Sequence, residues 1–265
     1  MSQTARTIDV GSGASRTSLW LAAVGFLLIA LGTGILSWFP TARVLEVTVQ
    51  ALGILLIAIA LLINWRIHVR RWGWATFIFF LVGTLAYGVM WSEYAIFPNS
   101  FDTPEATQRS LIIVGVGYLC AAIGMFLLIG RKHRQLTNAP ATGERAVVAT
   151  FPQLWLFAIG ALLSGVGMFV WLIPTATKLQ HVGLVIIGWA LVAISAIALR
   201  KLLTHQVGRV AAILIILAVL AYWAHFVLDV LPIWAHTEWR QPARWTSVAY
   251  VFAAISCILM ATRKR

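Results

Sequence analysis

Eight runs of about 20 predominantly apolar residues follow one another along this chain, and they leave it few possible folds. A helix needs about 20 such residues to cross a hydrocarbon layer about 30 Å thick. Because the backbone finds no water in that layer, each run is expected to form an α-helix. We therefore predict an all-α polytopic membrane protein with eight transmembrane helices. The expected spans are 19–39, 44–64, 73–92, 110–130, 153–173, 181–199, 210–230 and 246–262.

Composition agrees with this assignment, since 61% of the residues are hydrophobic and only 11% are charged. Soluble domains carry about 25% charged residues. Residues 1–18 are polar and are expected to form a disordered cytoplasmic tail. The first apolar run is too long for a typical signal peptide, so we expect it to be retained as a helix. The polar interval 135–152 is expected to be a cytoplasmic linker.

The positions of Lys and Arg predict the orientation. With eight spans, fifteen of the twenty cations fall in one set of loops and tails and five in the other. Cytoplasmic loops carry the excess of cations, so both termini are expected in the cytoplasm of a multi-pass inner-membrane protein. The net charge of +12 then indicates contact with anionic lipid headgroups rather than with nucleic acid.

The two halves of the chain resemble each other when one is shifted by 135 residues. The stretches "SWFPTAR" (37–43) and "WLIPTATK" (171–178) are the most visible pair, and their Pro-Thr-Ala motifs align one residue out of step. The shift also aligns glycines, cations and a tyrosine. These pairs are Gly25 with Gly160, Gly32 with Gly167, Gly53 with Gly188, Arg66 with Lys201, Tyr87 with Tyr222 and Arg109 with Arg244. We predict two parallel four-helix repeats, 19–134 and 153–265, related by an axis along the membrane normal.

Glycines spaced by seven residues mark helix faces where a neighbouring helix is expected to pack closely. One such face lies in "VGFLLIALGTGILSWFPTARVLEVTVQALGILLIAIALL", where a second glycine-bearing run follows a proline. This pattern resembles the short membrane repeat of HdeD-like proteins, most clearly in residues 19–64 and less so in 153–199. The resemblance implies a non-enzymatic inner-membrane protein linked to acid resistance. It also implies six spans, two fewer than this chain has, and it assigns no functional residue.

The stretch "YWAHFVLDVLP" (222–232) holds the most distinctive titratable pair. His225 and Asp229 are four residues apart, so they share one helix face near its outer end. Ionisable groups in a span suggest a functional site by default. Tyr222 lies on the same face, and Tyr87 is its equivalent in the first repeat. The alternative is a structural pair that closes the bundle.

Three further titratable residues are expected near the outer face: Glu46, His181 and Glu93. The repeat places Glu46 opposite His181 and Glu93 one position from the equivalent of Asp229. Together with the preceding residues they suggest an outer vestibule for protons or a solute. The alternative is that acidic residues simply avoid the cytoplasmic loops.

No catalytic or cofactor motif accompanies these residues. The chain contains no H-E-x-x-H metal motif and no Gly-rich phosphate loop. We expect no enzymatic activity, no metal and no cofactor. The first functional hypothesis is an HdeD-like role in acid or membrane stress, and the alternative is a small transporter or channel with a path between its halves. A homo-oligomer or a membrane complex partner is compatible with both. A polar cavity between the halves, as opposed to a solid apolar interface, would favour the transporter hypothesis.

Overall fold

Ten helices are present in the computed structural model, which describes residues 15–38, 43–96, 103–137, 151–173, 175–230 and 240–263. Eight of them are long and apolar enough to cross a membrane, which confirms the all-α polytopic fold class. These eight are α1 (Arg16–Trp38), α2 (Arg43–Ile63), α4 (Trp74–Ile96), α5 (Pro104–Thr137), α6 (Phe151–Val170), α7 (Lys178–Ala198), α9 (Arg209–Val230) and α10 (Arg240–Thr262). The other two, α3 (Trp65–Trp72) and α8 (Arg200–Val207), have eight residues each.

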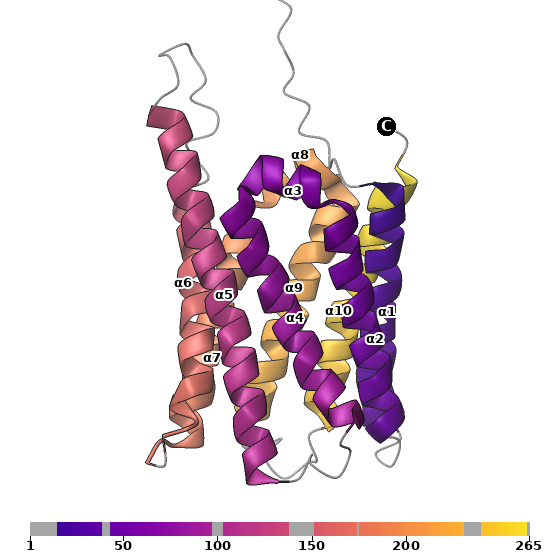
Figure 1. Cartoon of the computed structure of the whole chain (residues 1–265), viewed down its shortest axis with the longest axis vertical. Helices are drawn as coiled ribbons and strands as arrows, with labels where there is room; N and C mark the ends of the chain where they lie inside the picture. Colours follow the sequence, from indigo (N-terminus) through magenta and orange to yellow (C-terminus); the bar gives the residue numbers. More distant parts are fainter. Residues whose placement is uncertain are drawn as a thin grey trace, which may run out of the picture.

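The eight long helices form a closed ring. Each packs on the next in the order α1, α2, α4, α5, α6, α7, α9 and α10, and α10 packs in turn on α1. Figure 1 shows them running side by side along the long axis of the molecule. The ring brings the first and the last helix of the chain together, a contact that the order of the spans alone does not predict.

The short helices α3 and α8 lie at the same end of the ring (Figure 1). Sequence reasoning placed both stretches in loops. Gly73 ends α3 with φ 90°, and Gly208 ends α8 with φ 91°. Residues with a Cβ rarely adopt this left-handed region, so glycine allows the chain to turn sharply into α4 and α9. Each short helix therefore lies beside the end of a span instead of continuing it.

The two halves have the same order of elements with the same spacing. α2, α3 and α4 begin at Arg43, Trp65 and Trp74, and α7, α8 and α9 each begin 135 residues later. The two positive-φ glycines, Gly73 and Gly208, are separated by the same 135 residues. The duplicated pattern in the sequence thus corresponds to a duplicated pattern of helices and turns.

At the glycines spaced by seven residues, the backbones of neighbouring helices come into direct contact. A Cβ placed on Gly25 would lie 2.6 Å from the carbonyl oxygen of Gly53, and one on Gly160 would lie 2.5 Å from that of Gly188. Gly32 likewise meets the Glu46 carbonyl oxygen at 2.8 Å. These contacts hold α1 against α2 and α6 against α7, as the seven-residue spacing predicts.

The second Pro-Thr-Ala stretch leads into a capped helix. The hydroxyl of Thr177 accepts a hydrogen bond from the Gln180 N–H at 3.3 Å, and the Gln180 side chain accepts one from the Thr177 N–H at 2.9 Å. This reciprocal pair is a capping box, which starts α7 at Lys178. Residues 39–42 and Pro174 lie outside the described residues.

Some predicted boundaries were wrong by a few residues. α1 begins at Arg16, inside the range expected to be a disordered tail. α5 continues to Thr137 and α6 begins at Phe151, so helices extend into both ends of the expected linker 135–152. Polar residues at a span end remain helical where they reach water, and the apolar pattern does not report them.

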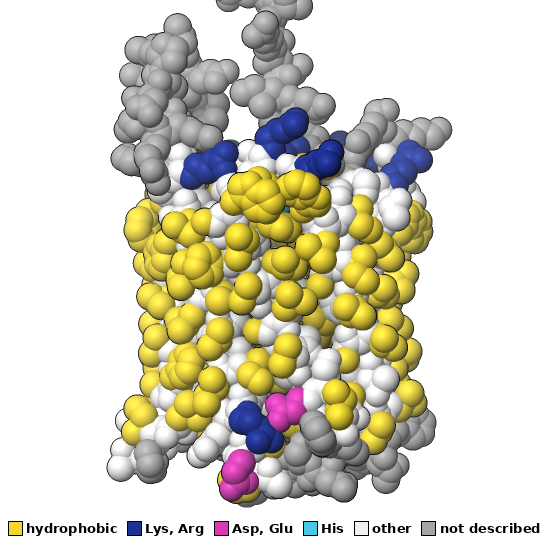
Figure 2. All heavy atoms as spheres, viewed as in Figure 1, with side chains coloured by type: hydrophobic (Ala, Val, Ile, Leu, Met, Phe, Trp, Pro, Cys, Tyr) yellow, Lys and Arg dark blue, Asp and Glu magenta, His cyan; other side chains and the backbone are white. Residues whose placement is uncertain are grey.

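Charge separates the two ends of the molecule. Figure 2 shows Lys and Arg side chains gathered at the end where α3 and α8 lie, and Asp and Glu with a smaller basic patch at the other end. Between the ends the surface is broadly apolar, and many large hydrophobic side chains are exposed there, such as Leu31 at 55% and Ile187 at 52%. Such a band fits hydrocarbon as its solvent. We refer to the α3 and α8 end as the basic end.

Candidate functional site

A cavity of about 490 Å³ lies inside the ring, and both halves of the chain contribute to its walls. We call it the central chamber. Aromatic side chains from four helices dominate its surface: Trp72 of α3, Phe80 of α4, Phe157 of α6 and Trp189 of α7. Leu61, Val114 and Ala121 complete the apolar part. Among the described residues that border the chamber, none is charged.

Four of the five tyrosines in the chain meet at the chamber: Tyr87, Tyr118, Tyr222 and Tyr250. Tyr118 accepts a hydrogen bond at 3.2 Å from the indole N–H of Trp189. Side-chain hydrogen bonds also link Tyr222 with Tyr87 and Tyr118, and Tyr250 with Tyr87 and Tyr222. We call these four residues the tyrosine cluster.

The rings of the cluster pack against one another and against Trp189 in tilted and edge-to-face arrangements. Trp189 and Tyr222 have centroids 4.6 Å apart, and the ring of Tyr118 meets Trp189 at 6.1 Å with an interplanar angle of 80°. Tyr222 and Tyr250 lie 6.0 Å apart at 75°. This geometry is the one that aromatic quadrupoles favour. It fixes side chains of α5, α7, α9 and α10 around one polar centre.

The chamber extends from the middle of the helices toward the basic end, where Trp72 borders it. Trp72 packs edge-on against Phe80 at 5.5 Å, and the His68 ring stacks on it at 4.3 Å. Burial, together with the nearby Arg71 charge, lowers the pKa of His68 below its usual 6.5. His68 is therefore neutral at pH 7 and packs as an aromatic ring.

Helix α3 is held in place by a cation from α5. The guanidinium of Arg131 donates to the carbonyl oxygens of Val69 at 3.5 Å and Arg70 at 3.3 Å. A positive charge at these carbonyls also complements the negative end of the helix dipole. The contact fixes Trp72 over the end of the chamber.

The predicted site residues fall into separate places. Tyr87 and Tyr222 come together in the tyrosine cluster, as their equivalent positions in the repeat suggest. The His225 ring packs beside Tyr222 at 6.1 Å and against Phe226 at 4.8 Å, and His225 does not line the chamber. Asp229 lies one turn further along α9, and its side chain is outside the described residues.

The remaining three predicted residues lie toward the opposite end from α3 and α8 and do not meet. Glu93 forms an ion pair with Arg109 at 2.8 Å. The ring of His181 donates from Nδ1 to the Gly167 carbonyl oxygen at 2.6 Å, within its own helical hairpin. Glu46 is fully buried, and its carboxylate accepts a hydrogen bond from the side chain of Gln50 at 2.8 Å. Each of these three side chains has a local partner in its own half of the chain.

Sequence reasoning missed Tyr118, Tyr250 and Trp189. It searched for charged groups near span ends, whereas these residues lie near the middle of α5, α10 and α7. Tyrosine and tryptophan usually mark the membrane interfaces. Their position in mid-span is the one signal in the sequence that could have indicated an interior polar site.

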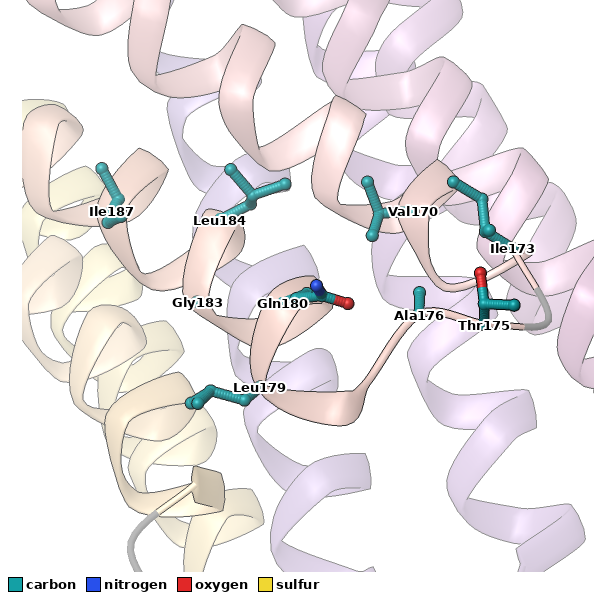
Figure 3. A pocket seen from close by; sticks show the side chains of 9 residues that line it. All are labelled: Val170, Ile173, Thr175, Ala176, Leu179, Gln180, Gly183, Leu184 and Ile187. Atoms are coloured by element: carbon teal, nitrogen blue, oxygen red, sulfur yellow. The ribbon is translucent and has the colours of Figure 1, made fainter.

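A second hollow of about 640 Å³ lies beside the α6–α7 hairpin (Figure 3). Its side chains come from a single hairpin, and several are strongly exposed, such as Leu179 at 67% and Ile173 at 51%. It is a groove on the outer surface of the ring, where lipid chains are the expected occupants. Within the described ranges, no three His, Cys, Asp or Glu side chains converge as metal ligands would.

No family model, no curated protein and no solved structure matches this chain.

Proposed function

We propose that this protein is a membrane-embedded small-molecule binding protein whose site is the central chamber between its two halves. The observation that carries the proposal is the chamber itself, which both halves line and into which four tyrosines converge. Of the two sequence hypotheses, this favours the transporter type. The proposed site lies near the middle of the helices, whereas the sequence hypothesis placed it near their outer ends.

The size and chemistry of the chamber fit a ligand site. Small-molecule sites measure about 300–1,000 Å³ and combine mainly apolar walls with a few convergent polar groups. Protein interiors otherwise fill such space, since voids larger than a water molecule are few. A chamber of this size between large aromatic side chains therefore indicates space for an occupant.

Parallel repeats place the chamber where such proteins hold their ligands. Transporters with repeats related by an axis along the membrane normal bind substrate near mid-depth at the repeat interface. Here α2, α3, α4 and α5 contribute from the first half, and α6, α7, α9 and α10 from the second. Movement of one half against the other would change access to the chamber.

Narrowing the chamber tests the proposal. Ala121 borders it from α5, whereas Ile123 of the same helix is 41% exposed on the outer surface. In the full-length protein in lipid nanodiscs, naphthalene probes of neutral, cationic and anionic type should include at least one that binds saturably. We expect Ala121→Phe to weaken that binding by about ten-fold or more, because its ring occupies the ligand's space.

The matched variant Ile123→Phe adds the same side chain toward lipid and should bind as the natural protein does. Equilibrium dialysis against empty nanodiscs measures both variants and corrects for partitioning into lipid. Equal binding by the two variants, or no saturable binding of any probe, would refute the proposed function.

We also propose that the basic end faces the cytoplasm of an inner-membrane protein, with its cations against anionic headgroups. A reporter active only in the cytoplasm should be active when fused after Arg265 or within 131–150, and silent within 99–106. The positive-inside bias is the physical reason. Activity at 99–106 alone would reverse the orientation. The acid-stress role implied by the HdeD-like resemblance stays a prediction, and the binding proposal does not depend on it.

A further inference from the structure

We infer that the ligand of the central chamber is a neutral molecule built on a flat ring that carries a hydroxyl or carbonyl oxygen, as phenols and quinones do. This inference rests on the proposed function and names the ligand class for the same site. Three features of the chamber lead to it: its lack of charge, its aromatic walls and its polar centre.

Charge is the first feature. The described residues that border the chamber include no Asp, Glu, Lys, Arg or His, and most of them belong to helices long and apolar enough to span a membrane. A charged ligand would leave water without meeting an opposite charge, which is strongly unfavourable in a medium of low dielectric constant. A neutral ligand meets no such penalty.

Aromatic walls alone would also suit a cation, because ring faces attract ammonium groups. In the tyrosine cluster, however, the ring faces already contact the edges of other aromatic side chains. Tyr118 packs edge to face with Trp189 at 80°, and Tyr222 with Tyr250 at 75°. Tyr222 also meets Phe226 at 70°. An ammonium group would have to displace these contacts, so the cluster lacks the open cage that cation binding requires.

The aromatic walls of the chamber are the second feature, and they favour a flat partner. Phe80 and Phe157 border the chamber from opposite halves of the chain, and Trp72 borders it at the basic end. Aromatic side chains pack with other rings in offset or edge-to-face geometry, which adds to the gain from burial alone. A flat ring between the halves makes such contacts with both of them.

The polar centre is the third feature and requires an oxygen on the ligand. A tyrosine hydroxyl both donates and accepts, and an indole N–H only donates. The cluster contributes four hydroxyls, with the Trp189 N–H already directed to Tyr118. A hydroxyl on the ligand would donate to a lone pair of the cluster, and a carbonyl would accept from one of its O–H groups in exchange for a hydrogen bond within the cluster. A plain hydrocarbon would gain neither bond.

The test uses three probes with one ring system: 1-naphthol, 1-naphthoate and 1-naphthyltrimethylammonium. Each is measured by equilibrium dialysis with the full-length protein in nanodiscs, and unsubstituted naphthalene serves as a fourth probe without oxygen. We expect 1-naphthol to bind at least about ten-fold more tightly than either charged probe. We also expect it to bind about five-fold more tightly than naphthalene, the usual effect of one hydrogen bond.

Two variants of α4 test the polar contact without changing the volume of the chamber greatly. Tyr87 belongs to the cluster, whereas Tyr94 interacts with Ser110 outside it. Tyr87→Phe should reduce the preference for 1-naphthol over naphthalene, and Tyr94→Phe should leave it unchanged. Because each removes one hydroxyl from the same helix, a general loss of stability would affect both.

Each outcome is decisive. Preferred binding of a charged probe, lost in Ala121→Phe, would overturn the ligand class and leave the proposed function standing. Equal binding of naphthol and naphthalene in every variant would overturn the role of the hydroxyls. Absence of saturable binding for all four probes would overturn the proposed function together with this inference.

Discussion

Replacing Gly188 by alanine is expected to force α6 and α7 apart. A Cβ at this position in α7 would lie 2.5 Å from the carbonyl oxygen of Gly160 in α6. It would also clash with Ser164 of α6. Real Cβ atoms do not approach a backbone oxygen this closely, and the backbone of α6 cannot rotate away as a side chain can. Overpacking of this kind costs about 1–3 kcal/mol and occasionally more. We expect a lower thermal unfolding temperature and a smaller monodisperse fraction in detergent.

Gly183 provides the matched control on the same helix. A Cβ there has nothing within 4 Å. Since alanine favours a helix over glycine by about 0.5–1 kcal/mol, Gly183→Ala should be neutral or slightly stabilising. Replacing glycine by alanine is thus expected to lower the stability at position 188 and to leave it unchanged or raise it slightly at position 183. Equal unfolding temperatures for the two variants would show that the close contact of α6 and α7 is wrong.

The repeat extends this prediction to the first half of the chain. A Cβ on Gly53 would lie 2.5 Å from the carbonyl oxygen of Gly25, matching the contact of Gly188 with Gly160. Gly53→Ala should therefore destabilise the α1–α2 contact to a similar degree. The sequence predicted these glycine faces because small residues at a seven-residue spacing are a local pattern on one helix.

The spans were predictable for the same local reason. Length and apolarity decide whether a segment crosses the membrane, and both are properties of the segment itself. The helices α3 and α8 were missed because eight residues rich in Arg, Lys and His resemble a loop in composition. What separates them from α4 and α9 is the left-handed turn at Gly73 and Gly208, and a glycine in sequence does not reveal its φ angle.

The chamber was not predictable, because it depends on which helices are neighbours. Tyr118 of α5 and Tyr250 of α10 are far apart in sequence, and they approach one site only once the ring has formed. Titratable groups such as Glu93 attracted attention instead, although Glu93 is paired with Arg109 in the structure. An unusual position of a common residue, tyrosine in mid-span, was a better indication of a site than an unusual residue near a span end.

Cysteines at Gly34 and Ser247 are expected to form a disulfide that joins the first span to the last. A Cβ on Gly34 would lie 3.5 Å from the Oγ of Ser247, which itself donates to the Ala30 carbonyl oxygen at 2.8 Å. Disulfides need Cβ atoms about 3.5–4.5 Å apart, and the Cβ of Ser247 lies one covalent bond from the Oγ in this contact. Cys120 and Cys257 would first be replaced by alanine, since both are free thiols.

The readout is whether the two halves stay covalently joined. With a protease site inserted in 138–150, cleavage should separate the halves of the reduced protein and leave most of the oxidised protein as one species. Gly34→Cys combined with Val248→Cys is the control, because Val248 is the next residue along α10 and is 38% exposed. Cross-linking of the 248 pair as efficiently as the 247 pair would contradict the observed register of α1 on α10.

The same cross-link can also be used to test by which route a ligand reaches the chamber. The contact between α1 and α10 closes the ring between the two halves, and Phe26 of α1 stacks near Tyr250 of the cluster at 6.2 Å. If a membrane-dissolved ligand enters by separation of these two helices, the disulfide should slow 1-naphthol binding and release together and leave the equilibrium constant unchanged. If it enters past Trp72 at the basic end, both rates should be unaffected by the disulfide and increased by Trp72→Ala. The first result assigns the entrance to the contact between α1 and α10, and the second assigns it to the basic end of the ring.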